Sequence, residues 1–211
     1  MDYQIIPAIL VQDKENLKDK LESVSGAAEW VQVDIMDGEF VPNFSIDIGE
    51  ILSVEHESKV SAHLMVKDPS RYIQKCKDAG VARVIFHYEA TQNHSDVIQK
   101  IDESGMQKGI ALNPETSIGV VRDFLHRVDM LLFLAVEPGF GGQGFIDNTL
   151  EKIKELRKIS PSINIGVDGG INEANIKEIK NAGANIFVIG SAIYFFKDRK
   201  RAIESLRRKI K

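Results

Sequence analysis

Residues 164–194 read NIGVDGGINEANIKEIKNAGANIFVIGSAIY and contain the repeating unit that decides the fold. Two short apolar runs, residues 164–167 and 186–189, enclose an amphipathic stretch at residues 173–181. Gly183 lies just beyond that stretch, where glycine accepts the left-handed conformation that ends a helix. The pattern is typical of two parallel strands joined by a crossover helix.

The same alternation runs through the whole chain. The runs that predict strands are residues 4–9, 30–35, 60–65, 83–87, 108–112, 130–135, 164–167 and 186–189. The stretches that predict helices are residues 14–24, 46–53, 69–79, 95–104, 117–127, 148–159, 173–181 and 199–210. Eight of each predict one α/β domain over residues 1–211, a closed (β/α)₈ TIM barrel. The alternative is an open doubly wound sheet, which requires a strand order that reverses.

Composition narrows the range of partners. The formal net charge is −4 over 211 residues, whereas a domain that binds nucleic acid or an acidic membrane by electrostatics is usually basic. We therefore expect no nucleic-acid partner and no membrane partner. Cys76 is the only cysteine, so no intrachain disulfide can form. No secretory signal or membrane-spanning run is recognisable, and a cytoplasmic location is expected.

Ionisable side chains stand at the ends of three predicted strands. Asp34 ends the second strand, His63 lies in the third and Asp168 follows the seventh. The carboxyl ends of barrel strands meet at one mouth, so these groups are expected to share a pocket. Singly, each has a structural interpretation as a cap or a satisfied buried group. His87, at the end of the fourth strand, is interpreted equally well as a rim contact or as a structural hydrogen-bonding group.

Three glycine-rich turns follow the last three predicted strands. They are PGFGGQGF at 138–145, VDGG at 167–170 and IGSAIY at 189–194. Glycine lets backbone amides approach an anion closely, and this is where barrels of this kind bind phosphate. Ordinary tight turns are the alternative interpretation. The predicted phosphate-binding residues are Gly139, Phe140, Gly141, Gly142, Gly169, Gly170, Gly190 and Ser191.

The chain resembles the ribulose-phosphate 3-epimerase family over almost its whole length. The motifs are PAIL at 7–10, VDIMDGEFVPN at 33–43, HLMV at 63–66, FHYEA at 86–90, ALNPET at 111–116, VEPGFGGQ at 136–143, VDGGIN at 167–172 and GSAI at 190–193. The resemblance implies a ribulose-phosphate-binding barrel and an isomerase of the pentose phosphate pathway. Its reaction would interconvert D-ribulose 5-phosphate and D-xylulose 5-phosphate by proton transfer at C3 through an enediolate.

The resemblance also implies roles for individual residues. Asp34 and Asp168 match the two catalytic aspartates, one on each face of the substrate. A divalent metal, zinc first and iron or manganese next, would be held by Asp34, His63 and Asp168, and His63 would also contact the substrate. Ala8, Met36, Met65 and Leu134 match pocket positions. A small phosphorylated ketose is the expected partner, and family members commonly form homo-oligomers.

Three positions depart from the family pattern. Gln32 stands where the family has a second histidine ligand, Ala8 where it usually has a serine, and Leu134 where it tends to have methionine. A carboxamide oxygen is a weaker zinc ligand than imidazole nitrogen, so the metal is expected to bind weakly, to be a different ion, or to be absent.

Three other functions compete with the ribulose-phosphate reaction. One is an epimerase of a six-carbon ketose phosphate, of the allulose 6-phosphate type. Another is a metal-poor, non-catalytic phosphosugar-binding barrel, suggested by Gln32 and Ala8. The third is lyase or decarboxylase chemistry, but such relatives place a lysine between aspartates after a strand, and VDIMDGEF has none.

Overall fold

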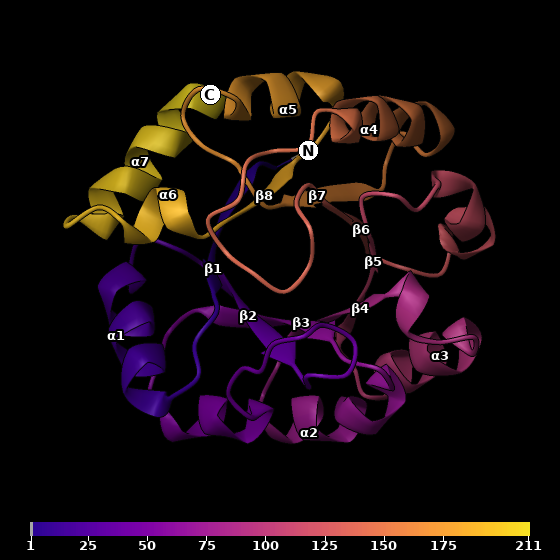
Figure 1. Ribbon diagram of the computed structural model, residues 1–211, viewed down its shortest axis with the longest axis horizontal. Helices are drawn as coiled ribbons and strands as arrows, with labels where there is room; N and C mark the ends of the chain where they lie inside the picture. Colours follow the sequence, from indigo (N-terminus) through magenta and orange to yellow (C-terminus); the bar gives the residue numbers. More distant parts are fainter. Residues whose placement is uncertain (1) are drawn as a thin grey trace.

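Short apolar runs build the centre of the molecule, because a strand covered on both faces needs apolar residues on both. The computed structural model describes residues 2–211 and closes these runs into a parallel barrel (Figure 1). β1 pairs with β8 from Gln4↔Ile186 to Pro7↔Ile189, so the predicted barrel is confirmed over the open sheet. The strands are β1 Gln4–Ile9, β2 Trp30–Met36, β3 Lys59–Met65, β4 Arg83–His87, β5 Gln107–Leu112, β6 Met130–Leu134, β7 Asn164–Asp168 and β8 Ile186–Ile189.

Helices surround the barrel, as Figure 1 shows in the view down its axis. The α-helices are α1 Lys14–Val24, α2 Ile73–Asp78, α3 His94–Glu103, α4 Asn148–Ile159, α5 Ile176–Ala182, α6 Ser191–Tyr194 and α7 Arg199–Ile210. Shorter 3₁₀ helices are η1 Ile48–Ser53, η2 Pro69–Tyr72, η3 Tyr88–Ala90 and η4 Ile118–Phe124. Across residues 2–211, no helix is long and apolar enough to cross a membrane.

Two of the predicted helices, at residues 46–53 and 117–127, are 3₁₀ helices and shorter than expected. Asp47 Oδ1 accepts a hydrogen bond from the Gly49 amide at 2.9 Å, and Ser117 Oγ accepts one from the Gly119 amide at 3.3 Å. These bonds reach two residues ahead and form a tight turn. Glycine is also a poor α-helix former, so both segments keep the tighter geometry.

Two layers of apolar side chains fill the molecule. Outward-facing strand residues such as Val33, Phe86 and Phe187 pack against the helices. Inward-facing residues form a second cluster inside the barrel, made of Ile6, Trp30, Ile85, Ala111, Met130, Leu132, Leu134, Ile186 and Val188. The interior is therefore packed with side chains and is not a channel. The carboxyl ends of the strands are where barrels of this kind bind their ligands.

Candidate active site

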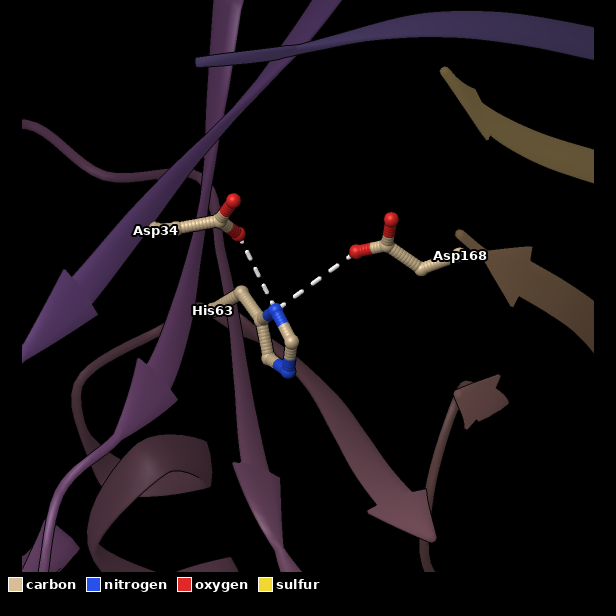
Figure 2. A group of neighbouring side chains, drawn as sticks. All are labelled: Asp34, His63 and Asp168. Atoms are coloured by element: carbon tan, nitrogen blue, oxygen red, sulfur yellow. Dashed lines mark hydrogen bonds and ion pairs between the residues drawn. The ribbon is translucent and has the colours of Figure 1, made fainter. Parts of the chain in front are cut away.

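Strand register brings the predicted ionisable residues together. Asp34 on β2 is paired with His63 on β3, and Gln32 lies two residues before Asp34, so all three side chains face inward. Asp168 ends β7 on the opposite side of the barrel. His63 Nδ1 lies 3.0 Å from Asp34 Oδ1 and 3.6 Å from Asp168 Oδ2. Figure 2 shows the imidazole between the two carboxyl groups.

The carboxamide of Gln32 occupies the space between these groups. Its Nε2 donates hydrogen bonds to Asp34 Oδ1 at 2.9 Å and to Asp168 Oδ2 at 2.7 Å, and lies 3.3 Å from His63 Nδ1. Its Oε1 is buried and has no hydrogen-bond partner. One amide nitrogen therefore holds two acidic side chains at opposite sides of the mouth. The sequence indicates Gln32 only as a substituted metal ligand.

Burial changes the proton affinity of both carboxyl groups. Burial raises the pKa of Asp34 to about 7, against the lowering effects of the Gln32 hydrogen bond and the Lys20 charge. Burial and then the charge of Asp34 raise the pKa of Asp168 to about 7, while His63 and Gln32 lower it. Two such groups titrate as a pair, and at neutral pH the pair holds a proton that either carboxyl group can carry. A base and an acid are thus present together.

A series of buried polar side chains continues behind His63, and His87 Nδ1 and Glu89 Oε2 face each other in it without a hydrogen bond. His63 Nε2 lies 2.9 Å from His87 Nε2, and His87 Nδ1 lies 3.4 Å from Glu89 Oε2. Glu89 Oε1 accepts a hydrogen bond from the Asn113 amide at 2.9 Å and another from the Thr116 hydroxyl. His87 is 0% exposed, so the structure favours the structural interpretation over a rim contact.

The same series of polar groups determines which nitrogen of each histidine ring carries the proton. Burial opposes ionisation of Glu89, but His87, Thr116 and Asn113 outweigh it and lower the Glu89 pKa to about 2. Burial lowers the pKa of His63 and brings the pKa of His87 to about 4, so both rings are neutral. The Glu89 anion, 3.4 Å from His87 Nδ1, favours the tautomer in which that nitrogen carries the proton. With this assignment, His63 Nε2–H donates to His87 Nε2. His63 Nδ1 is left with its lone pair toward the aspartates.

The glycine turns and the aspartates border one cavity of about 310 Å³. Every predicted phosphate-binding glycine lines it, as do Phe140, Ser191 and the four predicted pocket residues Ala8, Met36, Met65 and Leu134. His63 is 1% exposed and lies beneath this cavity, outside its lining. Gly170 has φ +67°, and a Cβ there would lie 2.4 Å from the Phe145 amide nitrogen. Only glycine fits this close approach of backbone to backbone.

The donor atoms of Asp34, His63 and Asp168 lie within 4.8 Å of one another. Three protein ligands with an open fourth position are typical of catalytic zinc sites. Gln32 Nε2 faces the same centre as a hydrogen-bond donor, and an amide N–H cannot bind a cation. A half-turn of the carboxamide would exchange it for Oε1, which has no other partner. The residues therefore fit a divalent metal when Gln32 is turned.

Comparison with known proteins agrees with this geometry. Residues 4–194 match a family model described as the ribulose-phosphate 3 epimerase family. A ribulose-phosphate 3-epimerase from Schizosaccharomyces pombe is 38% identical, with 98% of this chain and 93% of the relative covered. Those from Mycobacterium tuberculosis and Bacillus subtilis are 40% and 37% identical, each over 97% of this chain and over 91% and 98% of the relative.

Solved structures with low sequence identity share the barrel. A 3-hexulose-6-phosphate synthase superposes with a TM-score of 0.75 at 17% identity, and the match covers 100% of both chains. KGPDC from Streptococcus mutans has a TM-score of 0.78 at 13% identity, with 100% of this chain and 98% of that chain covered. At such identities the likeness concerns the fold alone.

Proposed function

The chain belongs to the ribulose-phosphate 3-epimerase family, and on that premise we propose that it interconverts D-ribulose 5-phosphate and D-xylulose 5-phosphate at C3. It is an epimerase and therefore an isomerase. The observation that carries the proposal is the pair of carboxyl groups, Asp34 and Asp168, linked across the mouth by one amide nitrogen. Inversion at carbon needs a proton acceptor on one face and a proton donor on the other, and the pair supplies both.

Each proton transfer involves one aspartate. The ionised carboxylate removes the C3 proton, and the electron pair of that C–H bond moves into the C2 carbonyl to give an enediolate. The protonated carboxyl on the opposite face then delivers its proton to C3, and the electrons return to rebuild the C2 carbonyl. The two aspartates have exchanged protonation states, and proton exchange with solvent restores them. A pKa of about 7 for both Asp34 and Asp168 suits each to either role at neutral pH.

The neighbouring side chains hold this pair in position. In the metal-free site, Gln32 fixes the two carboxyl oxygens through its amide hydrogens. His63 presents an unprotonated Nδ1 to the same centre. The glycine turns offer backbone amides to the phosphate, and packing of Gly170 against the Phe145 backbone supports their shape. Because the phosphate is bound at one end of the cavity, C3 is positioned between the aspartates.

We propose zinc as the metal of this centre, with iron or manganese as alternatives. Asp34, His63 and Asp168 would hold it, with Gln32 Oε1 as the fourth donor. When bound, such a cation acts as a Lewis acid that stabilises negative charge on the substrate oxygens.

Two further attributes are inferred. A cytoplasmic location is supported by a 37% identical rice relative named as a cytoplasmic isoform. A six-carbon ketose phosphate is the second substrate candidate, since Ala8 and Leu134, which depart from the family pattern, line the cavity together with the aspartates.

The experiment measures whether the proton delivered to C3 comes from solvent. Enzyme, ribulose 5-phosphate and a xylulose 5-phosphate detection system are combined in deuterium oxide, with and without zinc, iron, manganese or chelator. We expect product formation together with deuterium at C3 and at no other carbon. Product without deuterium at C3 would exclude this mechanism. A preference for allulose 6-phosphate over ribulose 5-phosphate in the same assay would favour the second substrate.

A further inference from the structure

Lys20 on α1 reaches the wall of the cavity. Among the residues that line it, all within the described part of the chain, Lys20 is the only lysine or arginine. Its Nζ donates to the Leu10 carbonyl at 3.1 Å and lies 4.9 Å from the centre of the Tyr194 ring. Lys20 is half-buried, unlike its neighbour Lys18, which is exposed.

The contacts of Lys20 place it between the two ends of the predicted substrate site. Leu10 directly follows β1, and β1 lies between β8 and β2 in the barrel. Tyr194 ends α6, the short helix that begins at Ser191 in the third glycine turn. On the other side, the charge of Lys20 is close enough to lower the pKa of Asp34. Lys20 thus borders both the glycine turns and the aspartate pair.

The charged side chains that line the cavity indicate what Lys20 does there. Three carboxyl side chains line it, those of Asp34, Glu137 and Asp168. Backbone amides contribute dipoles but no net charge, and a phosphate ester adds close to two negative charges at neutral pH. An anion entering this cavity is repelled by the ionised carboxyls. Lys20 is the side chain of the lining that offsets this repulsion.

On the β1 side of the cavity, the lining side chains of the described residues other than Lys20 offer no hydrogen-bond donor. The side chains of Ala8 and Leu10 line it and are apolar. An ammonium group has three N–H donors, and the Leu10 carbonyl uses one of them. The remaining donors of Lys20 are available to a ligand in the cavity that the side chain borders.

We propose that Lys20 is a substrate-binding residue that contacts the phosphate group of the ketose phosphate from the β1 side of the glycine turns. The inference rests on the proposed function for the identity of the substrate, but not for the binding of phosphate itself. Lys20 acts through charge and hydrogen bonding and takes no part in proton transfer at C3.

Arg199 provides a matched control. It also stacks on Tyr194, at 5.3 Å from the ring centre, and it pairs with Asp19 beside Lys20. It does not line the cavity. Arg199→Met therefore removes a positive charge from the same ring without changing the cavity wall, whereas Lys20→Met removes the charge that borders the cavity.

The experiment measures binding and turnover separately. Dissociation constants for inorganic phosphate and ribulose 5-phosphate are obtained by calorimetry for the parent, Lys20→Met, Lys20→Arg and Arg199→Met, beside kcat, KM and thermal midpoints. We expect Lys20→Met to weaken phosphate binding roughly 10- to 100-fold and to raise KM with little change in kcat. Lys20→Arg should restore most of the affinity, and Arg199→Met should match the parent.

Unchanged phosphate affinity in a folded Lys20→Met variant would overturn the proposal. Equal weakening in Lys20→Met and Arg199→Met would do the same, because it would show a general loss of positive charge. If phosphate binds through Lys20 but ribulose 5-phosphate is not epimerised, the proposed function fails and the role of Lys20 stands.

Discussion

Gln32 on β2 donates a 2.7 Å hydrogen bond to Asp168 on β7, across the mouth of the barrel and 136 positions along the chain. The same nitrogen binds Asp34 at 2.9 Å. A neutral amide thus lies among donor atoms that also suit a cation. We therefore expect the metal affinity of the proposed centre to depend on this one side chain.

Gln32→His is expected to strengthen zinc binding. Imidazole nitrogen is a better zinc ligand than a carboxamide, and the variant would supply a fourth strong donor beside Asp34, His63 and Asp168. We expect affinity to rise about 10- to 100-fold, the scale on which ligand-shell changes act. Competition with a fluorescent chelator measures this directly. Gln99→His, at an exposed position of α3, is the control and should leave affinity unchanged. Equal zinc affinity in parent and Gln32→His would contradict the assigned centre.

Asp34→Asn and Asp168→Asn are each expected to reduce epimerisation roughly 10²- to 10⁴-fold, because each removes one of the two carboxyl groups that we propose to transfer protons. The asparagine carbonyl can still accept the Gln32 hydrogen bond, so the fold is retained. Asp96→Asn, an exposed change on α3, should keep full activity. Measured turnover and circular dichroism separate loss of chemistry from loss of structure. Near-parental rates in both site variants would end the two-aspartate mechanism.

The aspartates should also make stability depend on pH. Their folded pKa values of about 7 lie above the ordinary 3.8, so the folded state binds more protons than the unfolded chain between these values. Stability then falls as pH rises from about 4 to about 7. With chelator present, thermal unfolding should show Asp34→Asn to be more stable than the parent at pH 8, by about 1–3 kcal/mol, and the gap should close near pH 4. A pH-independent gap would contradict the raised pKa values.

Glu89→Gln should change the tautomer of both His87 and His63, so that the other nitrogen of each ring carries the proton. The new carboxamide would donate to His87 Nδ1, His87 Nε2–H would then donate to His63, and His63 Nδ1 would carry a proton toward the aspartates. The lone pair that faces the metal centre would be lost. We expect metal affinity and kcat to fall roughly 10- to 100-fold. Nitrogen NMR of the His63 ring reads the tautomer.

Two controls accompany the Glu89 variant. Glu115→Gln removes an exposed carboxylate from the neighbouring loop and should change neither the tautomer nor the affinity. Glu89→Asp keeps the anion and should retain the parental tautomer. If the His63 tautomer is the same in Glu89→Gln as in the parent, Glu89 does not set it.

The sequence predicts the strands well because their apolar runs are set locally, and every predicted strand end lies within one residue of the structure. The meeting of Asp34, His63 and Asp168 was also predictable, since parallel strands bring their carboxyl ends to one mouth. The type of the helices at Ile48–Ser53 and Ile118–Phe124 was not, because side-chain bonds two residues ahead decided it.

The partners of Gln32 and Glu89 were beyond sequence reasoning for another reason. Which atoms a carboxamide or carboxylate meets depends on inter-strand register and side-chain rotamers, and both are fixed only in the packed barrel. The sequence contains one hint of the contact between His87 and Glu89, which is that a single residue separates them in the stretch HYE. The single-domain boundary at residues 1–211 and self-association stay predictions.

Closure of the barrel by β1 and β8 has a consequence for synthesis of the protein. The proposed active site takes residues from strands in both halves of the chain, and its two carboxyl groups cannot face each other until β7 has joined the barrel. We therefore expect a nascent chain to be inactive until β7 has emerged from the ribosome, although most of the chain has emerged before then. Recovery of turnover during refolding should accordingly trail the recovery of helical signal, because the last strands complete both the ring and the pocket.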